Sequence, residues 1–233
     1  MEQKTSSGRR YALQISYVLL LTASLPLNLL ALASLSTSAV SGGDLYVLPP
    51  KVYIALLLVY TLAIFIIGVL NIVKSFKMYS ENDYTRCINS MLILKYGLVF
   101  FFILNFSVIF VLMAGGSLVA IVASRGIVIF ALPFMLPWII AVILILAFFT
   151  WLLLIPGGFY GIQVIRFSYA HKKISLPLVI LHTLLQFCFL ADVPDAMYLS
   201  VKKWGVGKRS AVFIGCIYAI TFLAAVYIIL RVF

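Results

Sequence analysis

The sequence predicts an all-α fold: a polytopic transmembrane helical bundle of about six spans, some kinked or broken, forming a single integral membrane domain over residues 1–233. Composition is the first reason, because 65% of the residues are hydrophobic and only 10% are charged, against about 45–50% and about 25% in soluble domains. The second is a mean hydropathy of +1.20. The third is a series of apolar runs of the roughly 20 residues that a helix needs to cross the hydrocarbon core. Lipid is therefore the expected solvent.

Three spans are expected in the first half of the chain. Pro26 interrupts the first of them, which predicts a kink there. Two polar stretches separate the spans: 41–51, which is rich in the turn formers glycine and proline, and 74–86, the most polar part of the chain. The predicted spans are 11–36, 52–73 and 90–113.

The second half of the chain is harder to divide into spans. A glycine pair and a further glycine predict a loop at 115–126, with a short apolar piece inside it. The run 127–165 is either one long, kinked span or two short ones, because prolines and a second glycine pair interrupt it. The run 174–201 contains two aspartates around a proline, a poor sequence for a continuous membrane helix, and 211–230 is the last expected span.

Basic residues set the expected orientation. The net charge is +11, and Lys and Arg in short loops stay on the cytoplasmic side, where they contact anionic lipid head groups. Lys4, Arg9 and Arg10 therefore predict a cytoplasmic N-terminus, with the stretch 74–86 on the same side. These features predict a multi-pass protein of the cell membrane whose first partner is the bilayer. Nucleic acid is not an expected partner, because no soluble segment interleaves aromatic and basic residues.

The basic stretches 166–173 and 202–209 conflict with this orientation if 174–201 crosses the membrane fully. Three solutions stay open. The last stretch could be external, 174–201 could be a broken or re-entrant element, or 127–165 could divide into two spans. Six full crossings is the preferred solution, because the first charges of a chain usually dominate its orientation.

Four polar residues inside apolar runs are candidates for a ligand-binding site or a polar cavity. His182 and Gln186 are four residues apart and share one helix face, while Lys95 and Asn105 lie in the third span. Each has a structural explanation as well, namely hydrogen bonds between helices or, for Lys95, snorkelling to the interface. A proton relay is the functional alternative for His182, because histidine changes charge near neutral pH.

Asp192 and Asp195 need a cation if they are buried. Arg125 is the expected partner, because six spans place it on the same side of the membrane. The two acids would form either a salt bridge that fixes helix ends or an entry site for a cation. No catalytic residue, metal site or cofactor is predicted, because the other histidine, His171, lies in a loop and no Cys-x-x-Cys is present.

Small residues mark expected helix contacts. Gly157 and Gly161 form a G-x-x-x-G pattern, and Ala211, Gly215 and Ala219 recur at every fourth position. Such spacing lets two helix backbones approach closely, either within the chain or with a partner.

Several segments resemble small uncharacterised polytopic membrane proteins of Firmicutes. They are Lys95-Tyr96-Gly97-Leu98, Phe101–Phe106, Tyr160-Gly161-Ile162, Leu181–Phe187 and Asp192-Val193. The resemblance implies residence in a bacterial cell membrane and no established activity. It draws attention to Lys95, Asn105, His182, Gln186 and Asp192 without assigning them a role.

Three classes of function are compatible with the sequence. A small transporter or permease-like subunit is the leading one, because kinked spans and polar groups within the membrane are typical of transporters. The alternative is a non-enzymatic accessory, assembly or immunity-type partner of a larger complex, such as an ABC-type one. Besides the bilayer, the partners considered are another membrane protein or, in a homo-oligomer, a second copy of the chain. A membrane-embedded enzyme acting on a lipid comes last. No enzymatic activity is expected, because the chain has six acidic residues and no H-E-x-x-H, G-x-S-x-G or P-loop motif.

Overall fold

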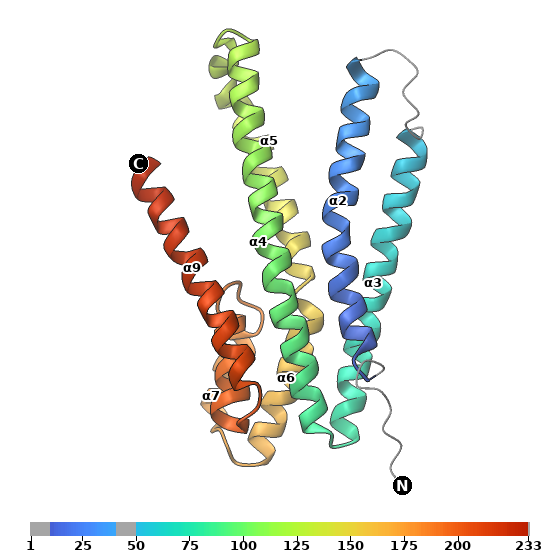
Figure 1. The fold of residues 1–233 in the computed structure, drawn as a ribbon, viewed down its shortest axis with the longest axis vertical. Helices are drawn as coiled ribbons and strands as arrows, with labels where there is room; N and C mark the ends of the chain where they lie inside the picture. Colours follow the sequence, from blue (N-terminus) through green and yellow to red (C-terminus); the bar gives the residue numbers. More distant parts are fainter. Residues whose placement is uncertain (1–9, 41–49, 233) are drawn as a thin grey trace. The chain divides into compact units, whose positions relative to one another are not determined.

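The computed structural model describes residues 10–40 and 50–232, and these residues form helices and no strand (Figure 1). The predicted loop at 41–51 lies almost wholly outside the described residues. The chain divides into two compact units, Met1–Leu70 with Leu98–Leu154 and Asn71–Gly97 with Ile155–Phe233. The first four helices are α2 (Ala12–Val40), α3 (Pro50–Ser80), α4 (Tyr84–Ala123) and α5 (Ile127–Leu152).

Within the described residues, α2, α3, α4 and α5 are the four helices long and apolar enough to cross a membrane. Many of their large apolar side chains are exposed, and Phe130, Phe134 and Trp138 on α5 are 82%, 81% and 77% exposed. An apolar surface this extensive needs lipid around it. Packing in the first unit includes hydrogen bonds from tyrosine hydroxyls to main-chain oxygens, such as Tyr17 Oη to Leu153 O at 3.2 Å.

Helix α4 continues through the segment that the sequence predicts to be a loop. The prediction for 115–126 was wrong up to Ala123, because Gly115 and Gly116 are helical. In lipid every main-chain N–H and C=O needs an intrahelical partner, and this requirement outweighs the low helix propensity of glycine. The turn comes later, where Arg125 and Gly126 have φ angles of 50° and 87°.

The two ambiguous apolar runs are both divided in the structure. The run 127–165 forms two helices, since α5 ends at Leu152 and α6 begins at Ile155. The run 174–201 is broken as well, which is a feature of the second solution above, just as the division of 127–165 is a feature of the third. The remaining elements are α6 (Ile155–Ala170), α7 (Leu176–Leu185), α8 (Asp192–Met197), the π-helix η1 (Tyr198–Lys203) and α9 (Lys208–Val232).

Length makes the break in 174–201 significant. The ten residues of α7 rise about 15 Å, which is half of the roughly 30 Å hydrocarbon core. Between α7 and α8 the chain is not helical, and Leu190 has a left-handed φ of 67°. None of the three short helices α7, α8 and η1 is therefore long enough to cross the membrane alone.

Three polar turns meet at one end of the second unit, and we call this region the basic end (74–86, 166–173 and 202–209). The ring of Trp204 is its centre. Tyr84 stacks on that ring at 4.7 Å between centroids, and the Lys173 Nζ lies 3.3 Å from the ring centroid. The indole Nε1 donates to Ser168 Oγ at 2.8 Å. The two basic stretches that flank 174–201 therefore lie on the same side of this unit.

Candidate functional site

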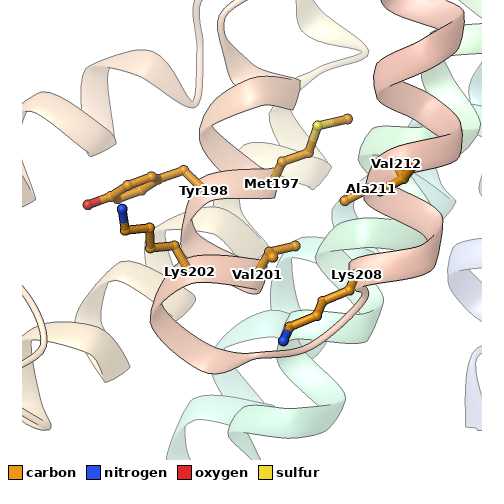
Figure 2. A pocket seen from close by; sticks show the side chains of 7 residues that line it. All are labelled: Met197, Tyr198, Val201, Lys202, Lys208, Ala211 and Val212. Atoms are coloured by element: carbon orange, nitrogen blue, oxygen red, sulfur yellow. The ribbon is translucent and has the colours of Figure 1, made fainter.

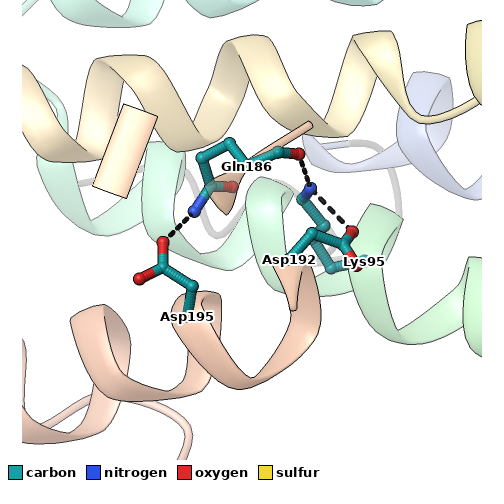
Figure 3. Close-up of polar contacts among 4 residues, drawn as sticks. All are labelled: Lys95, Gln186, Asp192 and Asp195. Carbon is teal, nitrogen blue, oxygen red and sulfur yellow. Dashed lines mark hydrogen bonds and ion pairs between the residues drawn. The ribbon is translucent and has the colours of Figure 1, made fainter. Parts of the chain in front are cut away.

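A buried ion pair joins α4 to α8 in the second unit. The Nζ of Lys95 lies 2.8 Å from Asp192 Oδ2 and donates a second hydrogen bond to the main-chain oxygen of Gln186 at 2.9 Å (Figure 3). Lys95 is 1% exposed and Asp192 is 3% exposed. Lys95 therefore does not snorkel to an interface but points into the interior of the unit.

A second group of polar side chains lies next to this pair. Asp195 accepts a hydrogen bond from Gln186 Nε2 at 2.5 Å through Oδ2, and its Oδ1 is hydrogen-bonded to His182 Nδ1. The imidazole ring stacks on Tyr198 with centroids 5.5 Å apart. Because Gln186 bonds Lys95 through its main chain and Asp195 through its side chain, the two groups form one connected network.

The break between α7 and α8 brings these residues together. His182 lies in the last turn of α7 and Gln186 caps it, so the i, i+4 spacing places both on one face. Asp192 and Asp195 are three residues apart on α8 and also share a face. The chain reverses between α7 and α8, so residues that a straight helix would have spread along its axis come together beside Lys95.

Glycines of α6 form the surface on which the network packs. A Cβ on Gly157 would lie 3.4 Å from Lys95 Cε, and one on Gly158 would lie 2.7 Å from the ring of Phe187. A Cβ on Gly161 would overlap the side-chain amide of Gln186. The G-x-x-x-G pattern therefore serves a contact within the chain, between α6 and the end of α7.

The network has unused bonding capacity. Among the described residues, His182 Nε2 and Gln186 Oε1 are buried side-chain atoms without a hydrogen-bond partner. With Lys95 and both carboxyl groups ionised and the imidazole neutral, the network would carry one excess negative charge. An uncompensated buried charge is costly. Uptake of one proton would neutralise the network.

The structure brings together five of the seven candidate residues. Lys95, His182, Gln186, Asp192 and Asp195 form the network, and each is at most 6% exposed. In this conformation the network is closed to solvent. The two remaining candidates belong to the first unit, where Asn105 is half-buried on α4 and Arg125 is exposed in the turn before α5.

The pairing of Lys95 with Asp192 was not foreseen from the sequence. Arg125 was the expected cation for the aspartates, but Lys95 is the one that the structure supplies. The available signal was that Lys95 and Asp192 are both ionisable residues inside apolar runs, which usually pair with one another.

Comparison with known proteins gives one match. A family model described as a family of unknown function (DUF6652) matches residues 10–205, a range that holds all five residues of the network and ends before α9. No curated protein matches the chain. No solved structure matches it either. Because the match extends over most of the sequence, the chain belongs to this family of unknown function.

Proposed function

We propose that the protein is a small transporter or permease-like membrane protein, without enzymatic activity, whose transport step is coupled to a proton. The buried network at the broken helix is the observation that carries this proposal. Ionisable groups inside membrane proteins are expensive to bury and usually mark a path for an ion or a substrate. Broken helices with polar groups at the break are typical of transporter binding sites.

A proton fits the network better than a metal cation does. Three of the four carboxylate oxygens have partners: Asp192 Oδ2 binds Lys95, and the two oxygens of Asp195 bind His182 and Gln186. Few oxygens are left to coordinate a metal ion, which needs about six. With Nδ1 donating to Asp195, the lone pair of His182 Nε2 is the open position for a proton.

Proton uptake would act on the break in 174–201. Protonation of His182 creates an imidazolium beside Asp195 and removes the excess negative charge. Loss of that proton restores the charge, which favours hydration and opening of the network. The non-helical residues 186–191 are the segment that can absorb such a movement, because they connect the two halves of the site.

The test is charge displacement in proteoliposomes, recorded on a solid-supported membrane after a step in external pH. We expect the wild-type protein to give a transient current, and Asp195→Asn and His182→Gln to reduce it at least fivefold. Asp83→Asn removes a carboxylate that bonds the main-chain N–H of Arg86 outside the network, and it should leave the current unchanged. A wild-type protein without a current, or a current that survives both network substitutions, would contradict the proposal.

The same proteoliposome recordings can be used to identify a substrate. A panel of small organic cations, organic anions and neutral solutes is added at constant pH gradient. A coupled substrate should convert the transient current into a sustained one. No sustained current across the panel, together with no pH-step current, would favour a non-transport role.

We infer that the basic end faces the cytoplasm, as does the N-terminus, in a bacterial cell membrane. Three basic stretches lie together on one side of the second unit, which supports this orientation. In this arrangement 174–203 enters and leaves from the cytoplasmic side as a re-entrant element. The conflict between the basic stretches and the positive-inside rule then disappears. In this topology 174–201 is not a full crossing, so the protein has one crossing fewer than the preferred six.

A non-enzymatic accessory role is the second candidate. The small residues of α9 favour it, because a Cβ on Gly215 would meet no atom within 4 Å. This stripe is free to pack against a helix of another membrane protein or of a second copy. Purification in a mild detergent followed by mass spectrometry would test it, since a stoichiometric partner is expected.

A further inference from the structure

An open groove lies between η1 and α9, apart from the buried network. Its volume is about 500 Å³. Figure 2 shows Met197 and Val201 on one wall, with Ala211 and Val212 on the other. Tyr198, Lys202 and Lys208 complete the lining. The groove therefore combines apolar walls with two cationic side chains.

The turn between η1 and α9 gives the groove its shape. Gly205 and Gly207 adopt left-handed φ angles of 70° and 77°, which let the chain reverse within a few residues. Helix α9 then begins beside η1, and the small side chain of Ala211 leaves the space between them unfilled. A larger residue at this position would occupy the groove.

The charge of the groove is one-sided. Lys202 and Lys208 are both exposed, and neither forms an ion pair within the part of the chain that the structure describes. No acidic residue is among the seven that line the groove. The groove also lies at the basic end, where the level of the lipid head groups is expected.

We propose that this groove is a binding site for an anionic phospholipid. The phosphate of the head group interacts with Lys208 and with Lys202 once the exposed Lys202 side chain, which lies beside Tyr198 in Figure 2, turns toward the groove. An acyl chain lies against Met197, Val201, Ala211 and Val212. Any lipid-facing groove is covered by acyl chains, so the specific content of the proposal is the selection of a negative head group. Charge complementarity favours this occupant over a neutral phospholipid, whose head-group cation offsets the charge of its phosphate, and over an apolar partner helix, which would leave the two lysines without a counter-ion.

The test is a competition between two lipids for the purified full-length protein. The protein in a neutral detergent receives an equimolar mixture of palmitoyl-oleoyl phosphatidylglycerol and the matching phosphatidylcholine, and native mass spectrometry counts the bound lipids. We expect phosphatidylglycerol to be favoured about tenfold. Lys202→Gln with Lys208→Gln should reduce this preference to below about threefold, because the two lysines supply most of the attraction between the groove and the negative head group.

A second pair of variants separates the groove from general surface charge. Lys77→Gln with Lys172→Gln removes the same charge from exposed positions elsewhere on the basic end and should keep the tenfold preference. Ala211→Phe fills the groove without changing any charge and should reduce the bound phosphatidylglycerol. Equal losses in both lysine pairs, or unchanged binding in Ala211→Phe, would overturn the proposal.

Two further outcomes are informative about the occupant. Glycerol phosphate, which has the charge but no acyl chain, should not compete at a tenfold excess over phosphatidylglycerol. Effective competition would show that the lysines bind phosphate alone and would overturn a lipid site. A co-purifying membrane protein that is lost in Ala211→Phe would assign the groove to a partner helix instead. Thermal unfolding of each variant without added lipid shows that the fold is intact.

Discussion

Lys95 and Asp192 illustrate how a charge is kept inside this protein. Each is almost fully buried, and each has the other as its ionic partner at 2.8 Å. The second hydrogen bond of Lys95, to the main chain of Gln186, satisfies another donor of the ammonium group. Removal of either partner would leave the other charge buried without compensation.

We therefore expect Lys95→Met to destabilise the protein by about 3–5 kcal/mol. The double variant Lys95→Met with Asp192→Leu removes both charges and should recover most of that loss. Thermal unfolding in dodecyl maltoside measures both effects. Lys77→Met is the matched control, because Lys77 forms an exposed i, i+4 pair with Glu81 at 3.8 Å, and such pairs contribute below about 0.5 kcal/mol. Equal losses for Lys95→Met and Lys77→Met would contradict a buried pair.

At this scale the sequence revealed the residues but not their partners. The i, i+4 spacing of His182 and Gln186 was enough to place both on one face of one helix. Local spacing did not identify the partner of Asp192, because Lys95 is 97 positions away in the chain; the ionisable character of both residues was the one available signal. A pairing over that distance depends on how α4 and α8 pack, and local periodicity does not contain this information.

Among the helices, the contact between α6 and α7 depends on the absence of a side chain at one position. Gly161 lies against the amide of Gln186, which cannot move away freely because it is fully buried and bonded to Asp195. We expect Gly161→Ala to destabilise the protein by about 1–3 kcal/mol through overpacking. Gly215→Ala is the control, since its surroundings are open, and it should be neutral or slightly stabilising. Unfolding midpoints that shift equally in both variants would argue against a specific contact.

The length of α4 gives a second prediction about an element. Gly116→Pro should destabilise the protein by about 3 kcal/mol, because proline inside a helix removes a hydrogen bond and clashes with the preceding turn. Gly116→Ala should have no such effect. The measurement is the unfolding midpoint together with the helical signal in circular dichroism. If Gly116→Pro were as stable as Gly116→Ala, the segment would be a loop, as its glycine pair suggested.

Hydropathy identified the long helices, because in lipid a continuous apolar run satisfies its main-chain hydrogen bonds by forming a helix. The same property made their ends hard to locate. The glycine pair at Gly115 is a turn signal in water, where the main chain can bond to solvent, but it is compatible with a helix in a bilayer. The break after Leu185 had a better signal, because the aspartates and Pro194 that follow disfavour a continuous membrane helix.

The topology of the whole molecule can be tested by cysteine labelling from each side of the membrane. Three serines within or next to the basic end can be replaced by cysteine with little change in size: Ser80, Ser175 and Ser210. In a background without native cysteines, all three should react with a membrane-impermeant maleimide in everted vesicles but not in intact spheroplasts. Ser124→Cys, in the turn after α4, should show the opposite pattern. Labelling of Ser175→Cys and Ser210→Cys from opposite sides would show that 174–201 crosses fully.

The concentration of charge at the basic end has an electrical consequence. Its three turns hold ten lysines and arginines against two acids, and each elementary charge that crosses a membrane potential of 100 mV costs about 2.3 kcal/mol. Export of this cluster against a negative interior would cost on the order of 20 kcal/mol. If the basic end faces the cytoplasm as proposed, a population inserted the other way should therefore be absent from energised cells, and the subunits of any assembly that this chain enters would all point the same way.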